Sequence, residues 1–299
     1  MKAAVVSEFG SAPRYQDFEE PAADGPDSVI VDVLAAALSP RVRSQAAGSH
    51  YSSTGELPLI PGIDGVGRTS TGELRYFLLP DTNRGSMAQR TAIDARRSIP
   101  LPKNADPVLI AAAMNPVMSS WVALKHRAGF RRGQSVMVLG ANGNAGRMAV
   151  DVARMLGAAE VHAIGREQLA DAEGLAQAAS RVDVVLDYLW GDATAGALRT
   201  IVPARYDDGQ RLTWVEIGSV AGLEASIPSA ALRAVDLQLV GSGQGSVDPR
   251  AIKDELKQIA KKLTAGAFDI GTRAVPLAEV EQIWGRQRDG DRIVLVPER

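Results

Sequence analysis

Apolar residues recur with strand periodicity in the first third of this chain and then give way to helical spacing. Residues 1 to about 118 hold short apolar runs of strand length, separated by turns that contain proline and glycine: Ala3–Phe9, Val29–Ala35 and Tyr76–Leu79. An alanine-rich helical stretch begins at Asp106, and we expect Pro116 to end or kink it. A second helix is expected over Ser119–Lys125. The pattern predicts a β-rich region that leads through helices into a different fold.

From residue 134 onward, strands and helices alternate. A strand at Ser135–Leu139 is followed by an amphipathic helix that Gly157 ends, and then by a strand at Glu160–Ile164. Buried parallel strands are expected at Val182–Asp187, Leu212–Gly218 and Leu237–Gly241, a helix from Asp248 to Ala265, and a last strand at Arg292–Val296. This alternation is typical of an α/β fold with a doubly wound parallel sheet.

The turn between the first strand and its helix has the composition of a dinucleotide-binding loop. It reads Gly140, Ala141, Asn142, Gly143, Asn144, Ala145 and Gly146, with alanine at the first position of the spaced glycine pattern. Glycines there allow a tight turn, close approach of the backbone to a pyrophosphate and close packing of helix on strand. Gly165 and Arg166 follow the second strand, where a cation favours the 2′-phosphate of NADP(H), although Glu167 comes next and Arg166 could also be a solvated loop residue. We therefore expect NADPH as the cofactor.

Composition narrows the class of protein. The 299 residues carry 33 basic and 35 acidic side chains, with no basic block that would suit nucleic acid. We expect the apolar runs to be too short for a membrane span, and the first residues suggest a strand and not a signal peptide, so we expect a cytoplasmic protein without a membrane partner. There is no cysteine, and the three histidines have no ligand spacing, so we expect no metal site.

Several ordered motifs together resemble a known family. They are Met1–Val5, Ala35–Pro40, Pro61–Gly67, Gly133–Val136 and Leu239–Ser242. They are similar to the medium-chain dehydrogenase/reductases, and within them to the zinc-free quinone oxidoreductase branch, which includes zeta-crystallin. The resemblance covers nearly the whole chain. It implies a GroES-like catalytic domain at 1–118, completed by 267–299, around a Rossmann NADP(H)-binding domain at 119–266, and commonly a homodimer.

The resemblance also suggests site residues. Tyr51 would reach the substrate carbonyl, although His50 could face the substrate instead and Tyr51 could be a packed loop residue. Ser119 would place a hydroxyl beside the nicotinamide, or it could only cap the helix that starts there. Strand ends next to the cofactor would contribute Gly218, Ser219, Gly241 and Ser242.

The chain departs from the family pattern in two places. The branch often has an acidic residue shortly after an asparagine–proline pair, but here Ser39-Pro40 is followed by Arg41 and Arg43. The 17-residue step from Arg166 to Asp183 is too short for the usual helix, third strand and helix. We expect the outer strand to be missing, either through a natural deletion or because a stretch is absent from the sequence.

The expected activity is hydride transfer from NADPH to quinones or α,β-unsaturated carbonyl compounds, with hydroxyl and backbone donors in place of a metal. The alternative is an NADPH-binding protein with little catalysis, in a structural or regulatory role. A methyltransferase is disfavoured because Arg166 stands where a carboxylate would be expected.

Overall fold

The computed structural model describes residues 1–286 and 290–298, which divide into two compact units. The first consists of Met1–Asn115 and Lys253–Arg299, and the second of Pro116–Ile252. Most of helix α8 (Pro249–Thr264) thus groups with the first unit, whereas the sequence analysis assigned it to the nucleotide-binding domain. The assignment of the two domains at residues 118 and 266 stays a prediction.

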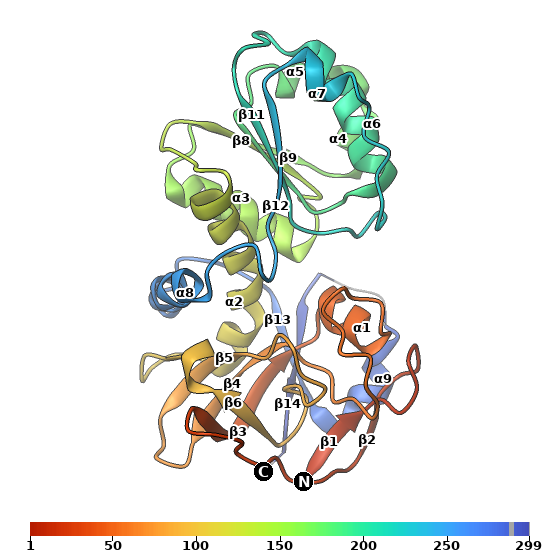
Figure 1. Ribbon diagram of the computed structural model, residues 1–299. Helices are drawn as coiled ribbons and strands as arrows, with labels where there is room; N and C mark the ends of the chain where they lie inside the picture. The colour runs from red at the N-terminus through yellow and green to blue at the C-terminus, as the bar shows by residue number, and fades with distance from the viewer. Residues whose placement is uncertain (287–289, 299) are drawn as a thin grey trace. The chain divides into compact units, whose positions relative to one another are not determined.

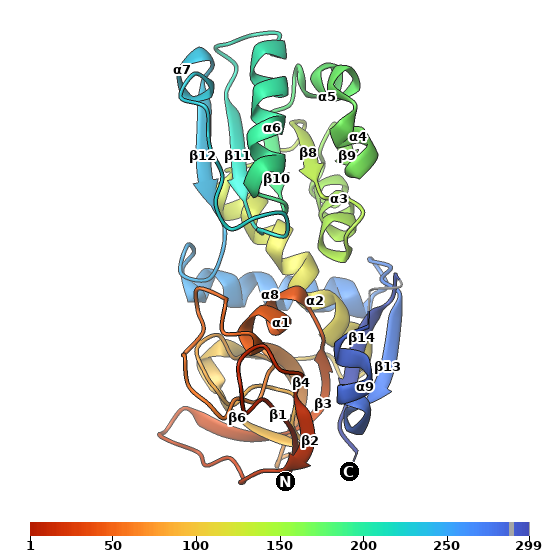
Figure 2. The ribbon, with the colours of Figure 1, turned by 90° about the vertical axis from the view of Figure 1, so that its right-hand side faces the viewer.

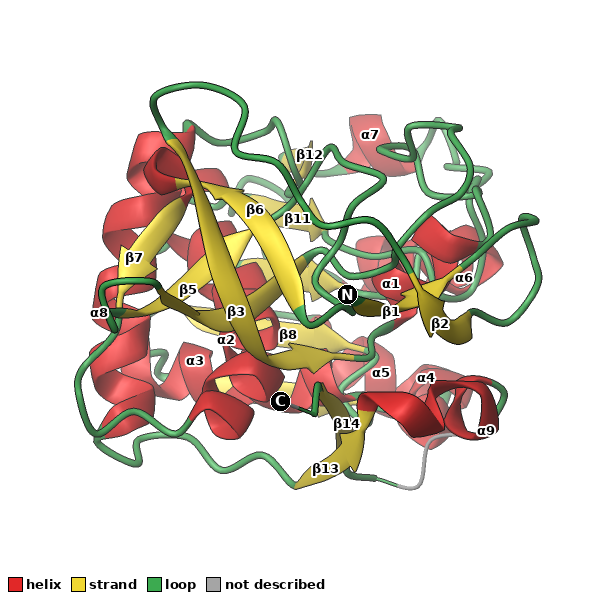
Figure 3. Cartoon of the chain, turned by 90° about the horizontal axis from the view of Figure 1, so that it is seen from below, coloured by secondary structure: helices red, strands yellow, loops and turns green. Residues whose placement is uncertain are grey.

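The first unit is built mainly from antiparallel strands. Its described residues form a seven-stranded sheet in the order β13-β14-β3-β4-β5-β7, with β6 also paired to β3, and a two-stranded sheet β1-β2. Figure 3 shows the long strand β3 beside β6. The strands are β1 Lys2–Val5, β2 Arg14–Asp17, β3 Ser28–Ala37, β4 Asp64–Thr69, β5 Leu74–Leu78, β6 Arg90–Asp94, β7 Ser98–Pro100, β13 Thr272–Pro276 and β14 Arg292–Val296.

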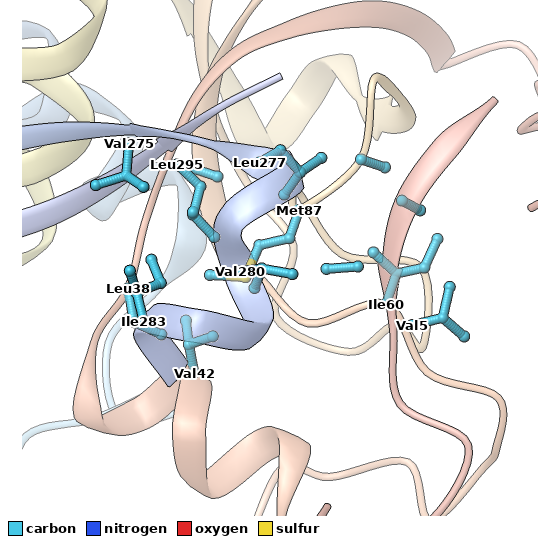
Figure 4. Packing of buried hydrophobic residues seen from close by; sticks show 14 of the residues in the cluster. Val5, Leu38, Val42, Ile60, Met87, Val275, Leu277, Val280, Ile283 and Leu295 are labelled. Carbon is cyan, nitrogen blue, oxygen red and sulfur yellow. The ribbon is translucent and has the colours of Figure 1, made fainter. Parts of the chain in front are cut away.

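Short helices and an apolar core complete this unit. Helix α1 (Pro40–Ala46) starts where the Ser39 hydroxyl accepts a hydrogen bond from Val42 N, with proline at the first position, which is a standard helix start. The other helices are η1 Ala95–Arg97, η4 Leu277–Glu279 and α9 Val280–Trp284. Figure 4 shows residues from both ends of the chain packed together in one cluster, among them Val5, Ile60, Val280 and Leu295. The C-terminal segment therefore completes the core of the first unit.

The second unit contains a five-stranded parallel sheet in the order β12-β11-β10-β8-β9 (Figure 2). The strands are β8 Ser135–Leu139, β9 Glu160–Ile164, β10 Val184–Asp187, β11 Leu212–Glu216 and β12 Leu237–Gly241. The helices are α3 Asn144–Leu156, α4 Arg166–Ala170, α5 Ala172–Ala179, α6 Gly191–Ile201, η3 Val202–Ala204 and α7 Ala231–Ala234. Helix α3 covers one face of the sheet, and α4 and α6 lie on the other (Figure 1). The expected doubly wound α/β fold is confirmed.

The outer strand is absent from the described residues of this sheet. After β9, the chain forms α4 and α5 and enters β10 directly, so β9 remains at the edge. The sheet therefore lacks the outer strand beyond β9, as the short step from Arg166 to Asp183 predicted.

One helix differs from the expectation. Helix α2 runs without a break from Pro107 to Val122, through Pro116, and continues as a π-helical turn at Ala123–Arg127 (η2). The prediction of two helices divided at Pro116 was wrong, because a proline removes only one helical hydrogen bond and surrounding contacts can maintain the helix.

The same helix corrects the expectation about apolar runs. Residues Pro107–Arg127 have the length and mean hydropathy, 1.5, of a membrane span, and they are the one such segment among the described residues. Because 67% of the most apolar stretch is buried inside the structure, this is also the pattern of a core helix in a soluble protein.

Candidate functional site

The carboxyl ends of the parallel strands in the second unit meet along one edge. The strand registers align Ile164, Leu139, Asp187, Glu216 and Gly241 in one row across the sheet. In an open parallel sheet, ligands bind beyond this edge, at the point where the strand order reverses. Here that point lies between β8 and β10, and the predicted cofactor residues lie at or directly after the row.

The glycine turn after β8 has the geometry of a phosphate cradle. Gly140 is left-handed, with φ +87°, and a Cβ on Gly146 would lie 2.2 Å from the Gly140 oxygen, so helix α3 can approach the strand only with glycine there. Gly143 begins the helix with no side-chain cap, and a Cβ on it would touch only the Gly140 oxygen, at 3.5 Å. The N-terminus of α3 therefore has no side-chain cap, which fits an anionic pyrophosphate.

The other residues of the turn have distinct positions. Ala141 is buried, and its N–H donates to the Ile164 oxygen at 3.1 Å, which ties the turn to β9. Asn144 and Ala145 form the first positions of α3, and Asn144 Oδ1 accepts a hydrogen bond of 2.6 Å from the Arg147 guanidinium. The Asn142 side chain lies over Gly165, where an added Cβ would be 2.5 Å from Nδ2.

Arg166 starts helix α4 immediately after Gly165, at the end of β9. Its side chain is exposed, and it forms no ion pair with any carboxylate in the described part of the chain. A guanidinium in this position is available for a 2′-phosphate. The structure thus brings together the glycine turn, Gly165 and Arg166, whereas their binding of NADPH stays a prediction.

Asp187, at the end of β10, was not identified from the sequence. Its carboxylate is completely buried and accepts four hydrogen bonds: from Leu189 N at 2.8 Å, Trp190 N at 3.2 Å, Trp214 Nε1 at 2.9 Å and the Thr194 hydroxyl. These bonds fix the turn that leads from β10 into α6. Asp187 is therefore the residue that shapes the centre of this edge.

Ser119 does not cap a helix, as one interpretation of the sequence suggested. It lies inside α2, where its hydroxyl donates to the Pro116 oxygen at 2.8 Å and is 3.1 Å from the hydroxyl of Tyr188. Either hydroxyl of the Ser119–Tyr188 pair can be the donor. Burial raises the pKa of Tyr188 to about 12, so this phenol keeps its proton at neutral pH. Tyr188 follows β10 directly and fixes the predicted serine.

The ends of β11 and β12 complete the edge. Gly218 lies against Tyr188: a Cβ added to Gly218 would be 3.4 Å from the backbone oxygen of Tyr188. Ser219 follows Gly218 in the same loop. Ser242 is buried, and its N–H donates to the Glu216 oxygen at 2.7 Å. Burial, with a contribution from Asp187, raises the pKa of Glu216.

Arg127 holds the loop that follows β12. Its Nε donates to the Gly241 oxygen at 2.7 Å and its Nη1 to the Ser246 oxygen at 3.2 Å. The sequence analysis did not identify Arg127 or Glu216, since both act through segments far from them in sequence.

Tyr51 and His50 belong to the first unit. Tyr51 is 72% exposed, which does not agree with a packed loop tyrosine, and its ring lies 4.4 Å from the His50 ring. His50 Nδ1 accepts a hydrogen bond of 3.2 Å from Ser52 N, while burial and Arg41 lower the pKa of His50 to about 4. His50 is therefore a neutral imidazole at pH 7. That Tyr51, and not His50, faces a substrate stays a prediction.

A buried polar cluster in the first unit surrounds Asp64. Its carboxylate accepts a hydrogen bond of 2.7 Å from the Tyr76 hydroxyl, and its backbone oxygen accepts one of 2.6 Å from Ser86. Burial raises the pKa of Asp64, while Tyr76 and the cations Arg292 and Arg41 oppose that shift. Arg41, which follows the Ser39-Pro40 pair, thus interacts electrostatically with a buried carboxylate.

The described residues contain no group of three or more histidine, cysteine, aspartate or glutamate side chains that could hold a metal ion.

Comparison with known proteins agrees with this geometry, although no family model matches the chain. The chain is 30% identical to the probable NADPH-dependent quinone reductase tdiC of Emericella nidulans over 359 aligned residues, which cover 99% of this chain and 100% of that protein. That alignment is longer than this chain, so it includes positions where this chain has no residue. The 2-methylene-furan-3-one reductase of Solanum lycopersicum is 29% identical over 154 residues, 46% of this chain and 39% of that protein.

Solved structures also show similarity to a quinone oxidoreductase. The quinone oxidoreductase from Thermus thermophilus, whose structure was also solved in a complex with NADPH, matches with a TM-score of 0.76 and 25% identity over 99% of this chain and 100% of that one. The predicted family is therefore confirmed. With similarity that extends over the whole chain, this protein belongs to the medium-chain dehydrogenase/reductase superfamily, in its zinc-free quinone oxidoreductase branch.

Proposed function

We propose that this chain catalyses the NADPH-dependent reduction of quinones or α,β-unsaturated carbonyl compounds, without a metal. The observation that supports this most directly is the carboxyl edge of the parallel sheet, where an uncapped helix N-terminus, Arg166 and the Ser119–Tyr188 hydroxyl pair follow adjacent strand ends. The reductases similar to this chain are named for quinone and enone-type substrates. Nothing favours the alternative of a nucleotide-binding protein with little catalysis.

The protein's own residues would bind and orient the cofactor. The amides at the start of α3 would hold the pyrophosphate, with Gly140, Ala141, Asn142, Gly143, Asn144, Ala145 and Gly146 as the loop around it. Gly165 and Arg166 would receive the ribose and its 2′-phosphate, and Gly218, Ser219, Gly241 and Ser242 would border the nicotinamide half. When bound, NADPH supplies a hydride to an electrophilic carbon.

Hydroxyl groups would stabilise the negative charge that develops on the substrate oxygen. Ser119 is a candidate on the nucleotide unit: its hydroxyl lies 3.1 Å from that of Tyr188, and to stabilise the substrate oxygen it would turn its proton from the Pro116 oxygen towards the substrate. Tyr51 is a candidate donor to the substrate carbonyl, since its side chain is exposed. In quinones and enones the negative charge is delocalised, so neutral donors suffice, whereas a simple ketone would form a localised alkoxide.

A panel of small quinones, enones, simple ketones and alcohols tests this proposal, with NADPH oxidation as the readout. We expect activity on conjugated acceptors and little on the others. Tyr51→Phe should lower kcat/KM by about 10- to 1000-fold if its hydroxyl is the donor. Tight NADPH binding without reduction of any conjugated acceptor would favour the non-catalytic role, and full activity of Tyr51→Phe would leave the reaction but remove this donor.

The cofactor preference has its own test. Arg166→Ala should weaken NADPH binding by about 1.5–3 kcal/mol, the range of a charge-assisted hydrogen bond, and should leave NADH binding nearly unchanged. Equal losses for both nucleotides in a fluorescence titration would contradict the role of Arg166.

We also propose a cytoplasmic homodimer. The family resemblance is the main reason for the dimer, and β12, an apolar strand at the sheet edge, offers a surface that a second copy could extend. Light scattering at micromolar concentration should give the mass of a dimer; a monomer mass alone would remove this proposal.

A further inference from the structure

The turn between β10 and α6 contains an unusual backbone conformation at Trp190. This residue has φ 56° and ψ −162°, and no other non-glycine residue in the described ranges has a positive φ. Bulky side chains are rare in this region, which is almost exclusive to glycine. Gly191 follows with φ +64°. The strain at Trp190 persists because Asp187 accepts hydrogen bonds from Trp190 N and from the preceding Leu189 N.

This turn lies at the centre of the carboxyl edge of the sheet. On one side, the Cβ position of Gly140 in the glycine turn is 3.0 Å from Leu189 Cδ2. On the other side, Ala221 N donates to the Leu189 oxygen at 2.8 Å, so the loop after β11 runs beside the turn. Through Leu189, the turn that contains Trp190 therefore lies between the segment expected to bind phosphate and the segment expected to border the nicotinamide.

The side chain of Trp190 has few specific partners among the contacts of the described residues. It is half-buried, it does not belong to the apolar cluster that contains Leu189, and it has no ring or cation partner in the described part of the chain. The neighbouring loop adds two exposed apolar side chains, Val220 at 65% and Leu223 at 75%. A strained aromatic residue beside exposed apolar side chains suits a flat, apolar ligand.

We propose that Trp190 is a specificity-determining residue, whose indole forms a flat wall that favours planar cyclic acceptors over small acyclic ones. This inference rests on the proposed function and specifies its substrate class. A planar quinone gains stacking area on such a wall, while an acyclic enone gains little. The strained turn keeps the wall in place, because the Asp187 hydrogen bonds fix the backbone on which it stands.

Three variants at position 190 distinguish the effect of the indole on substrate selectivity from the effect of the strained backbone on stability. Selectivity is measured as kcat/KM for 1,4-naphthoquinone divided by kcat/KM for methyl vinyl ketone. We expect Trp190→Ala and Trp190→Gly to lower this ratio by about 3- to 10-fold, the range of one aromatic contact, and Trp190→Phe to preserve it. The Kd of NADPH should remain unchanged in all three. An unchanged ratio in Trp190→Ala, or a parallel rise in the Kd of NADPH, would overturn the proposal.

Thermal unfolding tests the strain. Alanine and glycine both remove the indole, but only glycine accepts the backbone conformation without penalty, so Trp190→Gly should unfold about 2–6 °C above Trp190→Ala. A lower Tm for the glycine variant would contradict the strained turn.

Failure of the proposed function can be recognised separately. If the wild-type protein reduces neither acceptor, the reductase assignment fails, and calorimetric binding of 1,4-naphthoquinone still tests the wall. Its Kd should then rise by about 3- to 10-fold in Trp190→Ala; an equal Kd would overturn the wall as well.

Discussion

Asp187 in the second unit and Asp64 in the first are both carboxylates with almost no exposed surface, 0% and 3%, yet they are stabilised in different ways. Asp187 accepts hydrogen bonds from two backbone amides, a hydroxyl and an indole. Asp64 accepts one from Tyr76 and is influenced by two cations, Arg292 and Arg41. Local donors shape a turn, whereas distant cations join segments from both ends of the chain.

This difference has consequences for the two regions. Three of the four donors to Asp187 lie within seven residues of it, so the carboxylate sets the local path of the backbone beside the nucleotide edge. The partners of Asp64 come from α1, β5 and β14, so it stabilises the packing of the first unit. We therefore expect substitutions at Asp187 to affect both stability and function, and those around Asp64 to affect stability with a dependence on pH.

The largest effect is expected for Asp187→Ala. It leaves four buried donors without their acceptor, so the free energy of unfolding should fall by about 3–5 kcal/mol. Urea unfolding measures this loss. Asp192→Ala is a matched control, because Asp192 is exposed in the first turn of α6 and should contribute less than about 1 kcal/mol. Similar losses for both variants would mean that the buried network does not organise this turn.

A smaller effect that depends on pH is expected for Tyr76→Phe. Above the folded-state pKa of Asp64 it removes a donor from a buried carboxylate and should cost about 1.5–3 kcal/mol of unfolding free energy. Below the folded-state pKa of Asp64 the carboxyl is protonated, and the lost hydrogen bond is worth only about 0.5–1.5 kcal/mol. The cost of Tyr76→Phe should therefore decrease as the pH falls through that pKa.

The raised pKa of Asp64 determines how its own contribution to stability changes with pH. The folded state binds the proton more tightly than the unfolded chain, so the contribution of Asp64 to stability is fully present below the ordinary value of 3.8 and is lost as pH rises through the folded-state pKa. Asp64→Asn should remove this dependence. Denaturant unfolding at several pH values measures both variants, and a cost of Tyr76→Phe that grows towards acid would contradict the assignment.

The smallest effect is expected for Thr194→Val, which removes one donor to Asp187 and keeps the side-chain shape. It should cost about 1–1.5 kcal/mol alone and almost nothing in the Asp187→Ala background. This double-mutant cycle sharpens the comparison, because additive losses would show that Thr194 acts independently of the carboxylate.

The sequence predicted the repeating parts of the second unit well. Apolar runs of strand length located β8 to β12, and spaced glycines located the turn after β8, since both signals are local. The step from Arg166 to Asp183 also predicted the missing strand, because chain length limits how many elements fit. The prediction that the helical stretch divides into two helices at Pro116 was wrong. Tertiary contacts maintain a helix that a local rule would break.

The candidate site was less predictable for a physical reason. Asp187 and Trp214 are 27 residues apart, and their hydrogen bond exists only because β10 and β11 are neighbours in a specific register. Tyr188 is 69 residues from Ser119, so its hydroxyl partner was not visible in either segment. The positive φ of Trp190 could not be read from the residue type, since tryptophan normally avoids it.

The position of β9 has a consequence for solubility. No strand in the described ranges pairs with its outer side, so one row of its backbone amides and carbonyls is available for edge-to-edge association between molecules. The strand is only five residues long and begins with the exposed Glu160, which lies 3.4 Å from His162 Nε2. A short, charged edge discourages such association, so this sheet can end at β9 without becoming a template for aggregation.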